Sequence, residues 1–334
     1  MKRSTANSRT RRAAVSLMLI AMLFFGAAAS VTLETYAAKG AQVQASDSSG
    51  SIIKKGKNYY YRKANGKIRK KKGFVSCAGN RYYVKKGGKL RKSTTFKVGK
   101  YKYRARKNGV IATGVYKWSG KYNFSDASGR WIKKEGIVWY GGSSYHLNKS
   151  GVVSMNKVFS YGNTPYRADA GGRLTAIPIP DGGGNPVVGI AKNQVGIMTG
   201  KTYWRWYFGT TFRDTDRTPW CGAFVAWCYN AAGWYDKVTA ARSFGNLGYV
   251  PSYSKYADAN GKWVNQARAL PGDIIVFGKN RHVGLVEGIS DGCIVTIEGN
   301  AGPTAIIGCG KAGAVVRNVY AIGDRDIKGV IHVD

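Results

Sequence analysis

The sequence predicts an α+β protein, with a front half of repeated β-hairpins and a back half in which helices precede an antiparallel sheet. Three observations support this prediction. A four-position motif recurs at intervals of 20 to 23 residues within residues 56–176. A segment rich in Pro and Gly, 177–185, then excludes regular structure. Helical and later strand-like apolar spacing follows over residues 186–334.

The first 37 residues are typical of an export signal. Basic residues precede an uncharged apolar run over 13–29, and small residues allow cleavage after Ala29 or Ala37. The alternative is an uncleaved membrane anchor, since about 17 apolar residues is the lower limit for spanning a bilayer. Cleavage would leave no stable membrane insertion. Residues 38–55, rich in Ser, Gly, Ala and Gln, are expected to form a flexible leader.

Six copies of a repeat of about 21 residues follow, over residues 56–176. Each copy has a glycine, an aromatic residue four positions later, a second glycine and then an apolar residue. The first glycines are Gly56, Gly79, Gly99, Gly120, Gly141 and Gly162, and the aromatic residues are Tyr60, Tyr83, Tyr103, Phe124, Tyr145 and Tyr166. In the third copy we expect 101–104 and 110–111 to pair across a turn at 107–109. Stacked copies would form a repeat solenoid, because one hairpin buries too little surface alone; the alternative is a plain spacer.

The positive charge is concentrated in the front half. The chain carries a net charge of +36, and residues 39–120 contain 24 basic residues and one acidic residue. Residues 181–334 contain 16 basic and 12 acidic residues, a net charge of only +4. Such a surface favours a polyanionic partner: nucleic acid, anionic lipid or an anionic wall polymer. Export argues against nucleic acid.

The apolar spacing of the back half indicates a separate domain. Helical spacing covers 186–198 and 220–232, and the expected strands are 273–277, 282–289, 293–298, 314–320 and 327–333. The five cysteines are too few and too scattered for a disulfide scaffold, and an odd number leaves one thiol over. Cys293 and Cys309 are a candidate pair whose geometry the sequence does not test.

Cys221 is the candidate nucleophile. It follows Trp220 and Pro219 in the first turn of an expected helix, where the helix dipole and unpaired N–H groups stabilise a thiolate. The alternative is a buried, inert cysteine. Cys228, two turns further along the same apolar helix, is predicted to be such a core residue.

His282 is the natural base for this nucleophile. The chain has three histidines; His146 lies in a repeat and His332 near the end of the sequence. Glu298 closes the strand after His282 and is expected to orient its imidazole, with Asn300 as an alternative or auxiliary orienting group.

Four segments resemble, in order, the motifs of the CHAP family of cysteine, histidine-dependent amidohydrolases/peptidases. They are 220–225 (WCGAFV), 271–277 (PGDIIVF), 282–286 (HVGLV) and 297–300 (IEGN), and the resemblance extends over about 186–334. It implies a papain-like fold with Cys221 as nucleophile, His282 as base, and Glu298 and Asn300 as orienting residues. It also implies hydrolysis of peptidoglycan, at the muramoyl–alanine amide or within the stem or cross-bridge peptide.

No cofactor is implied. The Asp-Cys-Ser typical of the related NlpC/P60 family is absent, and Asp214 and Asp216 are too few for the acidic calcium loop of some phage relatives. The repeats, over most of 52–176, resemble cell-wall-binding repeats of Gram-positive surface enzymes. They depart from choline-binding versions in being rich in Tyr and Lys, with only Trp118, Trp131 and Trp139 available, so anionic wall polymers fit better than choline.

The function expected from the sequence is therefore a secreted, wall-associated peptidoglycan amidase or endopeptidase of a Gram-positive-type bacterium, acting through a thioester. Two alternatives remain open. One is a non-catalytic wall-binding or adhesion protein, and the other a secreted cationic protein that targets membranes or nucleic acid.

Overall fold

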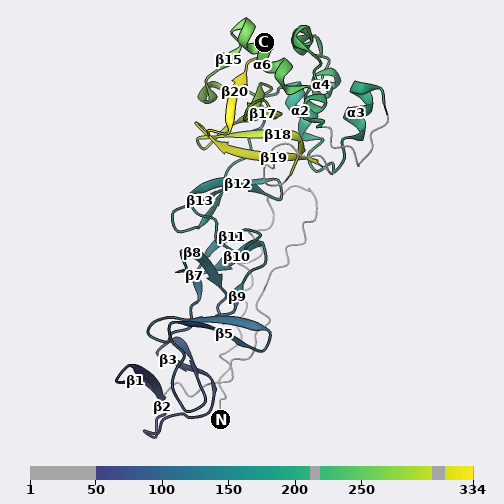
Figure 1. Ribbon diagram of the computed structural model, residues 1–334. Coiled ribbons are helices and arrows are strands. Elements are labelled where there is room, and N and C mark those ends of the chain that lie inside the picture. Colours follow the sequence, from purple (N-terminus) through teal and green to yellow (C-terminus); the bar gives the residue numbers. More distant parts are fainter. Residues whose placement is uncertain (1–49, 211–218, 303–312, 334) are drawn as a thin grey trace, which may run out of the picture. The chain divides into compact units, whose positions relative to one another are not determined.

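The computed structural model describes residues 50–210, 219–302 and 313–333 (Figure 1). β-Hairpins make up the part before residue 177, and helices with one six-stranded sheet make up the part after residue 185, so the predicted α+β class is confirmed. The predicted signal peptide, 1–37, lies outside the described residues, as does the leader up to residue 49. Among the described residues, no helix has the length and apolar character needed to cross a bilayer.

Six antiparallel hairpins match the six predicted repeats. They are β1 (Ser51–Lys55) with β2 (Asn58–Arg62), β3 (Gly73–Cys77) with β4 (Asn80–Val84), β5 (Thr94–Val98) with β6 (Tyr101–Ala105), β7 (Gly114–Trp118) with β8 (Lys121–Ser125), β10 (Gly136–Tyr140) with β11 (Ser143–Leu147), and β12 (Lys157–Tyr161) with β13 (Thr164–Ala168). Short third strands join the fourth and sixth hairpins: β9 (Trp131–Ile132) and β14 (Leu174–Ala176). The first glycine of every motif lies in the hairpin turn with φ between 55° and 74°, a conformation that favours glycine.

The predicted pairing within a repeat is present, but it is the shorter of two. It forms short ladders in the fourth and sixth copies and single β-bridges in the others, and the longer hairpin before it was not predicted. In the third copy β6 pairs with β5 across Gly99 and Lys100, whereas 107–109 forms a second turn that leads to a single β-bridge between Ala105 and Ile111. The turn at Gly99 joins two strands of five residues, so all five residue pairs form. The segment after the turn at 107–109 is too short for more than one bridge. Because the strand before each first glycine belongs to the hairpin, the first hairpin begins at Ser51, inside the expected leader.

Consecutive repeats are joined by backbone hydrogen bonds. The apolar segment at the end of one repeat donates to the hairpin before it: Leu90 N to Tyr59 O (2.8 Å), Ile111 N to Arg81 O (2.7 Å) and Val153 N to Tyr122 O (3.0 Å). Neighbouring hairpins also share small apolar cores. This is the stacking that lets short hairpins bury enough surface, and the larger solenoid geometry stays a prediction.

The part after the predicted linker, residues 177–185, contains helices and one sheet. The helices are α2 (Pro186–Lys192), α3 (Lys201–Phe208), α4 (Cys221–Ala231), α5 (Asp236–Thr239), η2 (Ala240–Phe244), α6 (Val250–Asn260) and η3 (Gln266–Arg268). The strands are β15 (Trp263–Val264), β16 (Ile274–Phe277), β17 (His282–Ser290), β18 (Cys293–Ala301), β19 (Ala314–Ala321) and β20 (Ile327–Ile331). The sheet is antiparallel, in the order β15-β20-β16-β17-β18-β19.

The five predicted strands correspond to β16–β20, and two predicted helices correspond to α2 and α4. Helices α3 and α6 were not predicted from the sequence. Helix α3 is dominated by aromatic residues, which have no strong helix propensity, and α6 combines Ser, Asp and Asn with a weak apolar stripe.

Helix α4 is the central helix of the core. Eight of its eleven residues are buried, and it packs against β17 and β18, so it is apolar on nearly all sides. A second apolar cluster, which includes Phe277 and Val330, is built from other residues of the same sheet. The core therefore places the first turn of α4 beside the strands that carry His282 and Glu298.

Candidate active site

Cys221 is the first residue of α4, as the sequence predicts. Its side chain is only 1% exposed. The backbone N–H groups of a first helical turn have no intrahelical acceptor, and the dipole places partial positive charge there. Trp220, the N-cap, stacks on Tyr203 with ring centroids 5.3 Å apart and an interplanar angle of 22°. The nucleophile candidate is thus held in a rigid apolar setting.

His282 begins β17 and is 2% exposed. Its Nε2 lies 3.0 Å from Glu298 Oε2. Nδ1 is buried and makes no hydrogen bond of normal geometry within the described structure. Burial lowers the pKa of His282, but interactions with Cys221 and Glu298 outweigh burial and raise it to about 10. The ring is therefore protonated at neutral pH, between the thiol of Cys221 and the carboxylate of Glu298.

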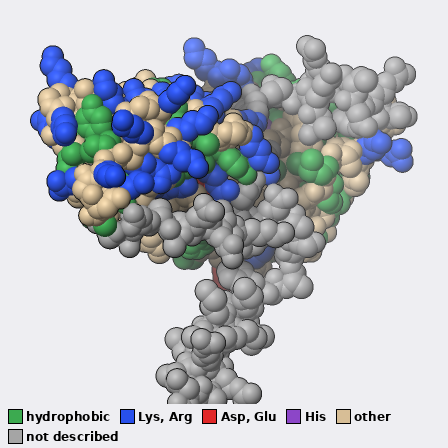
Figure 2. All heavy atoms as spheres, turned by 90° about the horizontal axis from the view of Figure 1, so that it is seen from below, with side chains coloured by type: hydrophobic (Ala, Val, Ile, Leu, Met, Phe, Trp, Pro, Cys, Tyr) green, Lys and Arg blue, Asp and Glu red, His purple; other side chains and the backbone are tan. Residues whose placement is uncertain are grey.

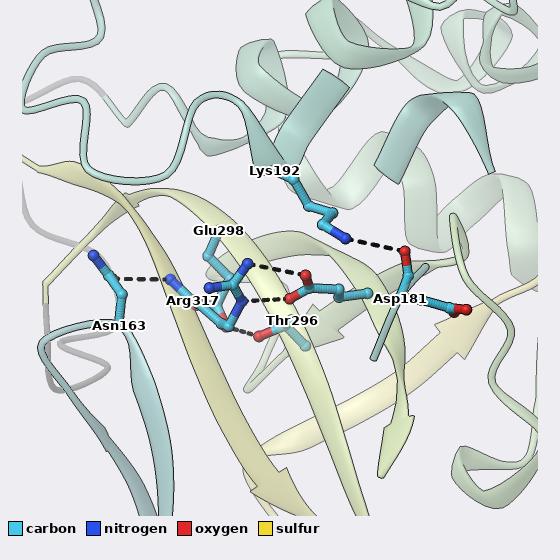
Figure 3. A network of polar contacts seen from close by, with 7 residues as sticks. Asn163, Asp181, Lys192, Thr296, Glu298 and Arg317 are labelled. Carbon is cyan, nitrogen blue, oxygen red and sulfur yellow. Dashed lines mark hydrogen bonds and ion pairs between the residues drawn. The ribbon is translucent and has the colours of Figure 1, made fainter. Parts of the chain in front are cut away.

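Glu298 is fully buried, and its carboxylate accepts four hydrogen bonds. Besides His282 Nε2, the donors are Asn318 Nδ2 (3.1 Å), Thr296 Oγ1 (2.6 Å) and Tyr320 OH (3.0 Å). Burial alone would raise the pKa of Glu298, but these donors, led by His282, lower it below its ordinary value. Figure 3 shows Thr296 and Glu298 on the same strand with the bond between them.

The three donors Thr296, Asn318 and Tyr320 were not predicted from the sequence. Strand alternation was a usable signal, because residues two apart on one strand face the same side of a sheet. Thr296 is two residues from Glu298, and Asn318 is two residues from Tyr320. What the sequence lacks is the register that sets Thr296 opposite Asn318 across β18 and β19.

Asn300 lies beyond a register shift in β18, between Glu298 and Ala301. Its backbone is in the left-handed region, with φ 58°, and its side chain is buried. Within the described residues, Asn300 Nδ2 has no hydrogen-bond partner and no bond joins Asn300 to His282. The geometry therefore brings Cys221, His282 and Glu298 together, and it gives the orienting contact to Glu298.

Cys228 and Cys293 are not part of the site. Cys228 is completely buried, and burial raises the pKa of its thiol well above the ordinary value, as fits the predicted core residue. Cys293 is also buried, in β18. Cys309, its candidate partner, lies outside the described residues.

Three glycines of the recognised motifs are required by close approach. A Cβ at Gly222 would lie 2.3 Å from Leu247 O, and one at Gly284 would lie 2.6 Å from Glu298 Cγ. A Cβ at Gly299 would lie 2.6 Å from the Phe224 side chain. These contacts bring the start of α4, β17 and the end of β18 together.

The arrangement is suited to acyl transfer, because a thiol at a helix start adjoins an imidazole fixed by a carboxylate. No group of three or more His, Cys, Asp or Glu residues suited to a metal ion occurs in the described parts of the chain. Asp214 and Asp216, weighed above as calcium ligands, lie outside those parts.

Solved structures similar to this chain include a protein of Streptococcus pneumoniae and one of a phage. Choline-binding protein F from Streptococcus pneumoniae matches at 20% identity, over 37% of this chain and 40% of that chain, with a TM-score of 0.28. A multimodular pneumococcal cell wall endolysin from phage Cp-1, complexed with choline, matches at 25% identity, over 38% of this chain and 37% of that chain, with a TM-score of 0.26. The chain thus spans about two fifths of each neighbour's length. No protein of curated function matches the sequence.

The match to a family model falls on the site itself. It covers residues 213–300, which contain the start of α4 and the strands that carry His282 and Glu298. The matched family is described as the CHAP domain. Residues 213–300 of this chain are therefore a CHAP domain.

Proposed function

We propose that this protein is a secreted peptidoglycan hydrolase that cleaves an amide or peptide bond with Cys221 as the nucleophile. The observation that carries the proposal is the buried contact of His282 Nε2 with Glu298 Oε2, 3.0 Å long, beside the first turn of a helix that begins at Cys221, within a CHAP domain. A buried ion pair of this kind is costly to maintain unless its geometry is good and its hydrogen bonds are satisfied.

The reaction follows from which ring nitrogen is occupied. Since Nε2 of His282 is held by Glu298, Nδ1 is the nitrogen that exchanges protons during the reaction. The Cys221 thiolate attacks the carbonyl carbon, and the tetrahedral intermediate collapses as His282 donates its Nδ1 proton to the leaving amine. A thioester and a free amine result.

The second half of the reaction reverses the role of the histidine. Neutral His282 takes a proton from water, the water oxygen attacks the thioester carbonyl, and the released thiolate is again paired with the imidazolium. The products are a carboxylic acid and the regenerated enzyme. The backbone N–H of Cys221, without an intrahelical acceptor, is the first oxyanion donor.

The basic repeats would hold the enzyme on its insoluble substrate. Lys and Arg side chains spread over a broad face of the molecule, with few carboxylates among them (Figure 2). We assign them anionic wall polymers rather than nucleic acid, because the expected export signal directs the chain out of the cell. Retention raises local enzyme concentration without altering the chemistry.

Two of the three tryptophans in the repeats have cationic partners from the chain itself. Lys102 Nζ and Lys133 Nζ lie 4.6 and 4.7 Å from the ring of Trp131, and Arg104 lies 5.2 Å from that of Trp118. A quaternary ammonium ligand would compete with these cations for the same ring faces. This supports an anionic ligand over choline.

The deciding experiment is digestion of purified peptidoglycan, with analysis of fragments and new termini by mass spectrometry. The wild-type chain and Cys228→Ala should release the same fragments, while Cys221→Ala should release none. New N-terminal amines on alanine, together with free lactyl carboxylates on the muramic acid of the glycan, would indicate an amidase. New termini within the stem or cross-bridge peptide would indicate an endopeptidase. Retention on walls of several cross-link types with no cleavage would refute the enzyme and leave a wall-binding protein.

A further inference from the structure

The fifth and sixth hairpins enclose a surface hollow that has no part in the chemistry above. Its volume is about 250 Å³. The lining combines two lysines, a carboxylate, an aromatic ring and polar groups: Glu135, His146, Asn148, Lys149, Ser150, Lys157 and Phe159. The hollow is smaller and more polar than the pockets that bind drug-sized ligands, so it suits only a small polar ligand.

His146 lines the hollow, packs on the rings of Phe159 and Tyr161, and has an unsatisfied ring nitrogen. The residue is 4% exposed; its Nδ1 lies 2.8 Å from Ser154 Oγ, and its Nε2 is buried without a hydrogen-bond partner among the described residues. Burial, aided by the charge of Lys157, lowers the pKa of His146 to about 4, so the ring is neutral at neutral pH. A neutral imidazole nitrogen either donates or accepts, and a ligand hydroxyl can meet both needs.

The charges and the ring define the rest of the ligand. Lys149 and Lys157 are exposed and present two ammonium groups, against the single carboxylate of Glu135. Lys157 Nζ lies 5.3 Å from the centre of the Phe159 ring, which is half-buried and offers an apolar wall. Two ammonium groups favour a phosphate and disfavour a cation, while the carboxylate can accept from hydroxyls.

We propose that this hollow binds a phosphate-bearing sugar unit of an anionic wall polymer. The assignment rests on the proposed role of the repeats in wall retention, and it is independent of the chemistry at Cys221. In this site Lys157 binds the phosphate and His146 forms a hydrogen bond with a hydroxyl of the sugar. The repeats would then bind the polymer through defined contacts in addition to general electrostatic attraction.

The test uses the histidine ring nitrogens as reporters in the full mature chain. With only three histidines in the sequence, the ¹⁵N signals of His146 can be assigned and followed during titration with N-acetylglucosamine 1-phosphate. We expect a saturable shift of His146 and none of His282. N-acetylglucosamine without the phosphate should bind about tenfold more weakly, and choline should leave His146 unchanged.

Two variants with the same change in charge distinguish binding at a defined site from general attraction to the basic repeats. Lys157→Gln should weaken binding of the sugar phosphate about tenfold, whereas Lys107→Gln, at an exposed turn of the third repeat, should not. Equal weakening by both variants, a shift with choline instead, or no shift of His146 would overturn the proposal. Wall retention and peptidoglycan cleavage measured on the same samples would show whether the broader function still stands.

Discussion

His282 Nε2 and Glu298 Oε2 lie 3.0 Å apart, and both side chains are almost completely removed from solvent. Burying a charged pair costs free energy that is recovered only when every remaining polar atom of the pair is satisfied. The Glu298 carboxylate meets that condition through donors on β18 and β19. The imidazole does not meet that condition, because its Nδ1 has no hydrogen-bond partner among the described residues. That imbalance leaves one ring nitrogen available for proton transfer.

Replacing Glu298 by Gln should lower kcat/KM by about 10²–10⁴-fold, because the uncharged amide no longer stabilises the imidazolium. The pKa of His282 should fall, so the alkaline limb of the pH–rate profile should move to lower pH. Stopped assays on solubilised peptidoglycan fragments across the pH range would measure both effects. An unchanged profile in a variant that remains folded by circular dichroism would contradict the role given to Glu298.

The stability of the protein should depend on pH through His282. Its pKa is raised from 6.5 to about 10 in the folded chain. The protonated ring therefore contributes stability that is fully present below about pH 6.5 and is lost as the pH rises towards 10. Cys221→Ala removes one of the two interactions that raise this pKa, so the loss should be smaller in the variant.

Urea unfolding of wild type and Cys221→Ala at about pH 6, 8 and 9.5 would test this, with the difference between the two proteins as the readout. Other groups that titrate near pH 10 cancel in that difference, apart from the thiol that the substitution removes. Parallel curves for the two proteins would mean that the thiol does not contribute to the pKa of His282.

Two glycine substitutions should have opposite effects. A Cβ at Gly222 would lie 2.3 Å from Leu247 O, so Gly222→Ala should lower the free energy of unfolding by about 1–3 kcal/mol. Gly189 is an exposed glycine within α2 that has no atom within 4 Å of the added Cβ. Gly189→Ala should therefore raise the free energy of unfolding by about 0.5–1 kcal/mol. Chemical denaturation would measure both, and a tolerated Gly222→Ala would show that the loop at Leu247 is not closely packed.

Retention on intact cell walls should weaken as salt rises, because the basic repeats act through screened charges. Between about 0.1 and 1 M salt the screening length falls from about 10 to 3 Å. Pull-down of the chain with purified walls over this range would measure the effect, with cleavage of a small soluble peptidoglycan fragment as the control. Retention that does not change with salt would argue for aromatic rather than ionic recognition.

Local patterns in the sequence were enough for the hairpin repeats, for α4 and for the five long strands. The positive φ of Gly56 and its equivalents follows from a turn that glycine makes easily, and the helix start at Cys221 follows from Pro219. The pairing across the second turn of each repeat was predicted, but the longer hairpin before it was missed, because each repeat contains two turn signals and the sequence pattern was assigned to only one of them.

The sequence by itself determined the residue types of the candidate site: one thiol at a helix start, one histidine at a strand start and one glutamate near a strand end. Only the tertiary structure decided that Glu298, and not Asn300, contacts His282. Asn300 lies past a register shift with φ 58°, and such a shift alters which side chains face which neighbours. The same holds for Thr296, Asn318 and Tyr320, whose convergence on one carboxylate depends on the register between β18 and β19, a long-range property that no local pattern encodes.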